Sequence, residues 1–123
     1  MDWFNRSWFR QGDHPAELSP SNGYVAPPLD GIWVTAPYLH NGSVPSLEAL
    51  LNSPARPRYW SRDFKRPQYN YGSPGWVYKE ESAGGKGDTY NTDLPGYSNR
   101  GHYFGDALST EQRKAVIEYL KTL

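Results

Sequence analysis

The sequence contains no cysteine, a single methionine and no long apolar run. Without cysteine the chain cannot form a disulfide framework, a zinc knuckle, an iron–sulfur site or a thiol nucleophile. No stretch approaches the roughly 20 apolar residues that a membrane-spanning helix needs. The first six residues also lack the basic-then-apolar layout of a signal peptide. We therefore expect no membrane span and no signal peptide in this chain.

The chain also lacks an excess of charge of either sign. It has 13 Lys and Arg against 13 Asp and Glu, so its formal net charge is zero. Basic and aromatic residues alternate between positions 54 and 76, a pattern that can bind single-stranded nucleic acid through ring stacking. The neutral total and the prolines that interrupt this stretch argue against that use, and we expect no nucleic-acid partner.

Aromatic residues, glycine and proline are abundant. The 123 residues include 5 Trp, 10 Tyr and 4 Phe together with 12 Gly and 11 Pro. Disordered chains are poor in aromatic residues, and each buried Trp or Tyr removes about 150–250 Å² from water. The length suits one domain, so residues 1–123 are expected to form a single domain or part of one. We predict a fold that is mainly irregular, with a few short α-helices and long loops.

Two segments carry helix signals. Leu47, Leu50 and Leu51 follow helical spacing, and a short helix is expected to open at Pro45 or Ser46 and to stop before Pro54. Residues 109–112 read Ser-Thr-Glu-Gln, a capping box that predicts a C-terminal helix over about 110–122. The residues expected on its inner face are Val116, Tyr119, Leu120 and Leu123.

Two further segments carry weaker signals of secondary structure. Residues 76–79 and 89–92 are β-prone and flank a glycine-rich loop, which predicts a small ribbon or a pair of extended segments near 76–92. At the start of the chain, the aromatic residues are spaced to form one stripe of a short helix, which we expect to pack on the rest of the protein. These residues are Trp3, Phe4, Trp8 and Phe9.

The three histidines are the first candidates for chemistry. His14, His40 and His102 form no H-x-x-x-H pair, so no helical metal site is written locally. His14 lies in a proline-rich polar segment, where a solvated side chain is the default. His40 suits either a structural hydrogen bond or a pocket. His102 follows a glycine, which permits close approach to a flat ligand, although composition alone favours a structural role. No Gly-x-Ser-x-Gly elbow is present, so a hydrolase has little support.

Three stretches resemble one family of proteins. They are GYVAPPLDGIWVTAPYLHNGSVPSL (residues 23–47), LPGYSNRGHYFG (residues 94–105) and IEYLKTL (residues 117–123). The first resembles the C-terminal part of c-type cytochromes related to di-haem cytochrome c peroxidases and di-haem rubber oxygenases. The other two resemble the closing segment of the rubber-oxygenase-like branch. The resemblance implies a cytochrome-c-like fold and redox work in the periplasm or outside the cell.

The resemblance also implies a set of ligands. The peroxidase motif Thr-x-Pro-Tyr-x-His-Asp-Gly is matched with Asn in place of Asp, by Thr35, Pro37, Tyr38, His40, Asn41 and Gly42. In that family the carbonyls matching Thr35 and Pro37 help to hold calcium. The position of the axial methionine is Pro54 here, whereas the rubber-oxygenase-like branch has a histidine that matches His102. We expect His102 to be the axial iron ligand.

The absence of cysteine also bears on how haem could be attached. Haem c is attached through C-x-x-C-H, and neither this motif nor the catalytic acid of the peroxidases is present. The chain is therefore expected to complete a haem pocket, without catalysis of its own, for an upstream cytochrome domain or a partner chain that carries C-x-x-C-H, and to serve electron transfer with a redox partner protein. The expected pocket residues are His102, His40, Tyr38, Trp33 and Phe104.

A second class of function uses the same aromatic residues without haem. In that alternative, exposed tryptophans form a platform for carbohydrate or another polymer, or the chain is a structural interaction module. The tryptophans considered for the platform are Trp3, Trp8, Trp60 and Trp76.

Overall fold

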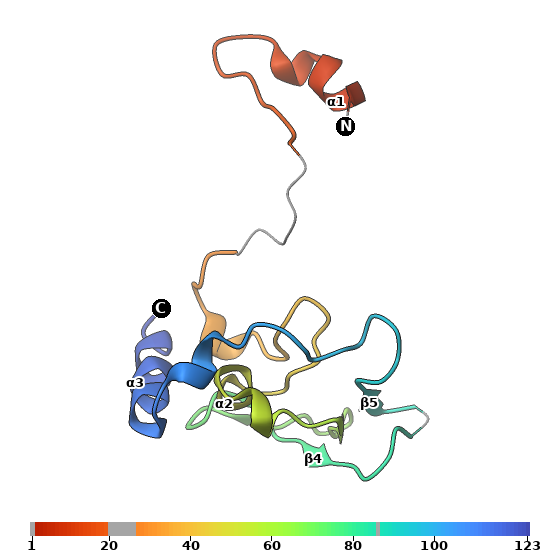
Figure 1. The fold of residues 1–123 in the computed structure, drawn as a ribbon, viewed down its shortest axis with the longest axis vertical. Helices are drawn as coiled ribbons and strands as arrows, with labels where there is room; N and C mark the ends of the chain where they lie inside the picture. The colour runs from red at the N-terminus through yellow and green to blue at the C-terminus, as the bar shows by residue number, and fades with distance from the viewer. Residues whose placement is uncertain (1, 20–26, 86) are drawn as a thin grey trace.

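The computed structural model describes residues 2–19, 27–85 and 87–123. Figure 1 shows an N-terminal arm (residues 2–19) standing apart from a body made of the remaining described residues. The arm holds α1 (Asp2–Arg6) and the 3₁₀ turn η1 (Trp8–Arg10). No described helix is long and apolar enough to cross a membrane.

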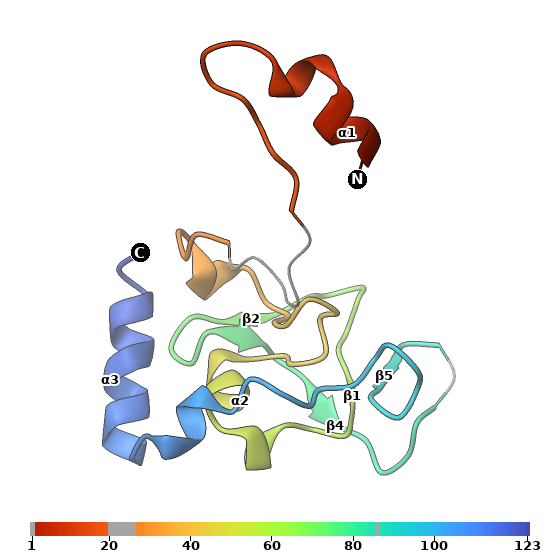
Figure 2. The ribbon, with the colours of Figure 1, turned by 45° about the horizontal axis from the view of Figure 1, so that its top comes forward.

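The body contains short elements joined by long loops. Its helical elements are η2 (Ile32–Val34), α2 (Leu47–Leu51), η3 (Ser53–Ala55), η4 (Phe104–Ala107) and α3 (Thr110–Leu120). Its strands are β1 (Tyr59–Ser61), β2 (Tyr69–Asn70), β3 (Gly75–Trp76), β4 (Lys79–Glu80) and β5 (Thr89–Asn91). Figure 2 shows α3 at one edge of the body and β5 at the opposite edge.

The strands form more sheet than the sequence predicts. A three-stranded antiparallel sheet has the order β4-β1-β5, with Trp60 of β1 opposite Glu80 on one side and Tyr90 on the other. The ribbon expected near 76–92 is wrong in its pairing, because β1 separates β4 from β5. A second hairpin pairs β2 with β3. The description "mainly irregular" therefore understates the two sheets, although every strand has three residues or fewer.

Both predicted helices are present, and both begin at their predicted caps. The Ser46 hydroxyl accepts a hydrogen bond from the Ala49 amide at 3.2 Å. Ser109 and Gln112 form the reciprocal capping box of α3. Each pair satisfies backbone donors that a helix start leaves without partners.

The inner face of α3 differs from the prediction. Ile117 is its buried residue, Val116 and Leu120 are half-buried, and Tyr119 is exposed. The buried face of α3 is shifted from the predicted one, because α3 packs on α2 through a face centred on Ile117. Its helical geometry also ends at Leu120, earlier than residue 122.

The core lies where the chain folds back between η2 and α2. Val44 and Leu47 are fully buried, and Tyr38, Ala49 and Ile117 pack with them. The core excludes large surfaces from water in a short stretch of chain, and this apolar burial is the main stabilising contribution. It leaves the loops of the body to be held chiefly by hydrogen bonds.

The arm does not follow the expectation that it packs on the rest of the protein. None of its described residues is buried, and Trp3 and Trp8 are 78% and 70% exposed. Phe9 instead stacks between Phe4 and Trp8, with ring centroids 5.0 and 3.9 Å apart. The arm is closed on itself by Asn5, which exchanges two hydrogen bonds with the backbone of Leu18.

Candidate functional site

His102 lies in a loop that is anchored at both ends. We call residues 96–105 the His102 loop. At its start, the Asn41 amide donates to the carbonyls of Gly96 and Ser98 at 3.1 and 2.8 Å. The Asn99 amide donates to the carbonyl of Pro57 at 3.0 Å. Side-chain amides thus hold the first half of the loop against distant backbone.

Arg56 holds the second half of the loop. Its guanidinium donates five hydrogen bonds, all to backbone carbonyls, at 2.7–3.1 Å. The carbonyls that accept them belong to Ala49, Leu50, Asn99, Gly101 and His102. Two of these residues lie in α2 and three lie in the His102 loop. One side chain therefore ties the loop to a helix that packs in the core.

The end of the loop is fixed by contacts with the residues after α2. The Asp106 carboxylate accepts hydrogen bonds from the Ser53 amide and hydroxyl at 2.7 and 2.5 Å. These bonds from Ser53 lower the pKa of the Asp106 carboxyl. Burial lowers the pKa of the Arg56 guanidinium, and the negative charge of Asp106 opposes that effect. Gly105 packs directly on the backbone of Leu51.

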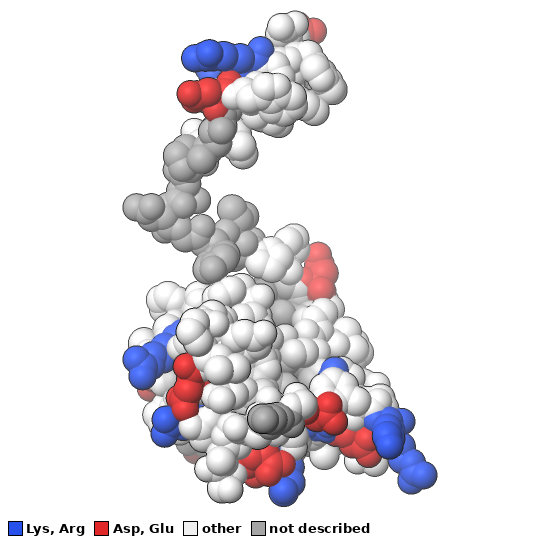
Figure 3. Space-filling view, turned by 90° about the vertical axis from the view of Figure 1, so that its right-hand side faces the viewer, with Lys and Arg blue, Asp and Glu red and all other residues white. Residues whose placement is uncertain are grey.

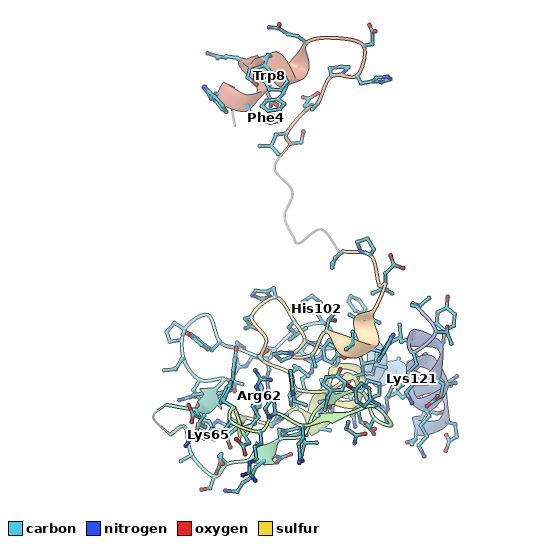
Figure 4. The ribbon with its side chains drawn as sticks, turned by 180° about the vertical axis from the view of Figure 1, so that it is seen from behind. Phe4, Trp8, Arg62, Lys65, His102 and Lys121 are labelled. Atoms are coloured by element: carbon cyan, nitrogen blue, oxygen red, sulfur yellow. The ribbon has the colours of Figure 1, made fainter. Side chains whose placement is uncertain are left out.

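The loop turns its apolar and imidazole side chains outward. Gly101 and His102 both have left-handed backbone, with φ of +87° and +53°. His102 and Tyr103 are exposed, and Phe104 is 87% exposed. Figure 4 marks His102 on the body, away from the arm that carries Phe4 and Trp8. The site thus presents an exposed histidine, followed in the chain by two exposed aromatic residues, on a backbone held by hydrogen bonds.

Two of the expected pocket residues lie in a separate aromatic cluster. Tyr38 is 4% exposed and donates a hydrogen bond to the Ile32 carbonyl at 3.0 Å. Burial raises the pKa of its hydroxyl. Trp33 is half-buried, with its ring 6.3 Å from Tyr71 and its carbonyl bonded by the Tyr69 hydroxyl at 2.6 Å. Trp33 and Tyr38 are thus linked through Tyr69, whereas His102 and Phe104 are exposed residues of the His102 loop.

The motif residues Thr35, Pro37 and His40 lie on the surface side of this cluster. Thr35 and His40 are exposed and Pro37 is half-buried, while the Thr35 hydroxyl donates to the Ile32 carbonyl at 3.1 Å. Over the ranges that the structure describes, no three His, Asp or Glu side chains gather closely enough to hold a metal ion.

Asn41 and Arg56 are the residues that sequence reasoning missed. An aspartate at position 41, as in the peroxidase motif, could not donate to the carbonyls of Gly96 and Ser98, so the Asn is what links the motif to the His102 loop. Arg56 gave no signal beyond its membership of the basic and aromatic stretch. Its partners among the loop residues lie 43–46 positions away, a separation at which no periodic pattern arises.

The tryptophan platform is wrong for two of its four members. Trp60 is 4% exposed and its indole donates to the Ser43 carbonyl at 3.0 Å. Trp76 is half-buried and donates to the Ala36 carbonyl at 2.8 Å. Trp3 and Trp8 remain exposed, in the arm.

The grooves of the body are open and mixed in charge. One of about 680 Å³ is lined by Arg56, Arg58, Asp93 and the first part of the His102 loop, and another of about 610 Å³ by Arg62, Asp63 and Arg66. On the face shown in Figure 3, basic and acidic side chains alternate.

Comparison with known proteins finds a family match for part of the chain. Residues 23–61 match the family described as RoxA-like, cytochrome c-like. The matched segment contains Asn41 and Arg56 and ends before the His102 loop. This match supports a cytochrome c-like family and a cytochrome-related role, and it is compatible with haem c that is attached outside this cysteine-free chain.

Two proteins of Sinorhizobium fredii are similar over more of the chain. The uncharacterized protein y4iJ is 44% identical over 109 residues, which cover 81% of this chain and 18% of that protein. The uncharacterized protein y4iM is 36% identical over 132 residues, which cover 87% of this chain and 29% of that protein. The chain thus spans less than a third of the length of these curated relatives.

Proposed function

We propose that this chain completes the haem pocket of a c-type cytochrome and supplies His102 as an axial ligand of the iron. In this proposal the chain is the C-terminal part of a cytochrome c-like domain. The C-x-x-C-H segment comes from an upstream domain or a partner chain. The complex transfers electrons with a redox partner in the periplasm or outside the cell. The chain by itself is not catalytic.

The observation that carries the proposal is the exposure of His102 in a loop that also exposes Tyr103 and Phe104. Exposed apolar side chains are costly to leave in water and commonly mark a surface that another group covers. Tyr103 and Phe104 directly follow His102 and are exposed, and Leu94 and Tyr97, earlier in the chain, are exposed as well. A flat, apolar group with a metal at its centre would cover these rings and use the imidazole.

The residues present fit one side of such a group. A neutral imidazole is a common axial ligand of haem iron, and the haem would supply one-electron redox chemistry. His102 is exposed, while its own carbonyl accepts a hydrogen bond from Arg56. Phe104 and Tyr103 would exclude water from the iron's neighbourhood, which favours electron transfer when both axial positions are filled. The grooves are open, so the other side of the pocket must come from the partner.

Further parts of the proposal rest on the resemblance to the di-haem families. One of these parts is a calcium ion held by the carbonyls of Thr35 and Pro37. Another is a pocket wall formed by His40, Trp33 and Tyr38. Because Tyr38 is committed to the core, its contribution would be to support Trp33 rather than to touch the haem.

Replacement of His102 by asparagine tests the ligand assignment. The probe is a haem c peptide that carries C-x-x-C-H and has one axial position of the iron open. We expect the wild-type chain to convert its optical spectrum from high-spin to low-spin with saturable dependence on concentration. We expect His102→Asn to weaken this conversion at least about tenfold, since asparagine accepts left-handed backbone but is a poor iron ligand.

His14 provides the control. His14→Ala should leave the conversion within about twofold of wild type, because it removes an exposed imidazole of the arm. A His102→Asn chain that is folded by circular dichroism and still gives the wild-type low-spin spectrum would overturn the assignment. An equal loss in His14→Ala would indicate nonspecific imidazole binding and would also overturn it.

A second candidate function is favoured by the arm. Trp3, Trp8 and the stacked Phe4 and Phe9 leave much aromatic surface exposed, and such rings bind apolar faces of sugars and other polymers. If the chain is a polymer-binding module, a soluble polysaccharide will quench tryptophan fluorescence in wild type but not in a Trp3→Ala, Trp8→Ala variant. The haem c peptide will then give no low-spin spectrum.

A further inference from the structure

We propose that Arg56 is the positioning residue of this site. Its guanidinium holds Gly101 and His102 in left-handed backbone and thereby aims the His102 imidazole outward. The part of this inference that concerns iron rests on the proposed function, whereas the part that concerns the loop stands on its own. Arg56 belongs to the segment that matches the RoxA-like family, and His102 lies outside that segment.

The hydrogen bonds of Arg56 assign it an internal task. A guanidinium has five N–H donors in a rigid fork. The Nε donates to Ala49, and Nη1 and Nη2 donate twice each. All five donors are therefore taken by carbonyls, and none remains for an anion or a substrate. Lysine, with three donors on one rotating nitrogen, could not reproduce this set.

The left-handed turn explains why the fork is needed. A histidine with φ of +53° is unfavourable relative to ordinary backbone, because its Cβ approaches the following carbonyl. Within four residues, the carbonyls of Asn99, Gly101 and His102 all point to the same guanidinium. Convergence of this kind requires a sharp turn, which the two left-handed residues provide. The five hydrogen bonds offset the unfavourable conformational free energy of the left-handed turn, and the imidazole lies on the outer side of the loop.

Contacts around the guanidinium keep it in place. The Tyr103 ring centroid lies 5.8 Å from the Arg56 Cζ. The Asp106 carboxylate, fixed by Ser53, supplies a compensating negative charge. The arginine thus lies against the Tyr103 ring and in the field of the Asp106 charge, and its removal would break its hydrogen bonds to both α2 and the His102 loop.

Trypsin provides a local test in the whole chain. The Arg100–Gly101 bond lies within the His102 loop, whereas the Arg56–Pro57 bond resists trypsin because proline follows it. We expect Arg56→Gln to raise the rate of cleavage after Arg100 about tenfold, because the loop loses all its bonds to the fork. Cleavage after Arg10 in the exposed arm should not change, and cleavage after Arg113 in α3 reports unfolding of the body.

Matched variants distinguish the effect of the guanidinium's five donors from the effect of its charge. Arg56→Lys keeps the charge, and we expect a smaller rise, about threefold, in cleavage after Arg100. Arg58→Gln is the control, since Arg58 is an exposed neighbour whose guanidinium bonds only the Asp93 carboxylate among the described residues. It should leave cleavage after Arg100 unchanged. If Arg56→Gln unfolds the body, Arg56→Lys is compared with wild type and with Arg58→Gln instead.

The haem c peptide separates positioning from mere folding. In folded Arg56→Gln, or in Arg56→Lys, we expect low-spin conversion to weaken at least about fivefold while cleavage after Arg113 stays at the wild-type rate. Wild-type cleavage after Arg100 in these variants would overturn the role of Arg56 in the loop. Faster cleavage with unchanged low-spin conversion would overturn its role in positioning. Loss of the proposed function is recognised separately, by an unchanged spectrum in His102→Asn.

Discussion

Replacement of Gly105 by alanine is expected to destabilise the body strongly. An alanine Cβ at this position would lie 2.3 Å from the Leu51 carbonyl oxygen and 2.6 Å from the Leu51 Cα. Both atoms are backbone at the end of α2, so neither can rotate away. We expect a loss on the order of 3 kcal/mol in the free energy of unfolding, measured by denaturant titration.

Gly101→Ala supplies the control within the same loop. Nothing lies within 4 Å of a Cβ added at Gly101, so this variant meets no clash and is penalised only by its φ of +87°. Its expected cost is about 1 kcal/mol. If Gly105→Ala lost no more stability than Gly101→Ala, the close packing of η4 on α2 would be wrong. The two glycines therefore separate close packing from backbone conformation.

The parts of the fold that sequence predicts are those with local causes. Ser46 and Ser109 mark the starts of α2 and α3 because a hydroxyl can satisfy an amide three residues away. The expected stop before Pro54 is also found, but Asn52 is the residue that leaves helical backbone, and Ser53 lies in the 3₁₀ turn η3. These signals depend on neighbours in the chain and therefore do not depend on tertiary contacts.

The sheet was beyond such reasoning because its pairing is between distant segments. β1 lies between β4 and β5, so Trp60 faces residues 20 and 30 positions further along. Strands of two or three residues carry too little alternation to specify a register. The partner of β4 is decided by burial of Trp60 in the body, which is a property of the assembled fold rather than of residues 76–92.

The candidate site divides in the same way. The Gly-His-aromatic sequence and the family resemblance both pointed to His102 and Phe104, and both residues are exposed in the His102 loop. The anchors Asn41 and Arg56 act on backbone carbonyls, which every residue has, so their targets leave no mark in the sequence. Polar residues that hold a loop in this way become visible only when the chain is folded.

Trp60 links the sheet to the core and gives the other large expected effect. Its ring stacks on Tyr90 with centroids 5.4 Å apart, and meets Tyr78 edge-on at 6.1 Å. Its indole N–H donates to the carbonyl of Ser43, a fully buried residue next to Val44 in the core. The side chain therefore joins β1 to both the β5 strand and the segment that precedes α2.

Replacement of Trp60 by alanine should lower the free energy of unfolding by about 3–5 kcal/mol, since it opens a large cavity and leaves the Ser43 carbonyl without its donor. Trp60→Phe keeps most of the ring and should lose about 1–2 kcal/mol. Trp8→Ala, in the exposed arm, should remain within about 0.5 kcal/mol of wild type. Chemical denaturation followed by far-ultraviolet circular dichroism compares the three. Equal losses for Trp60→Ala and Trp8→Ala would contradict the burial of Trp60, and would restore it as a candidate for an exposed binding platform.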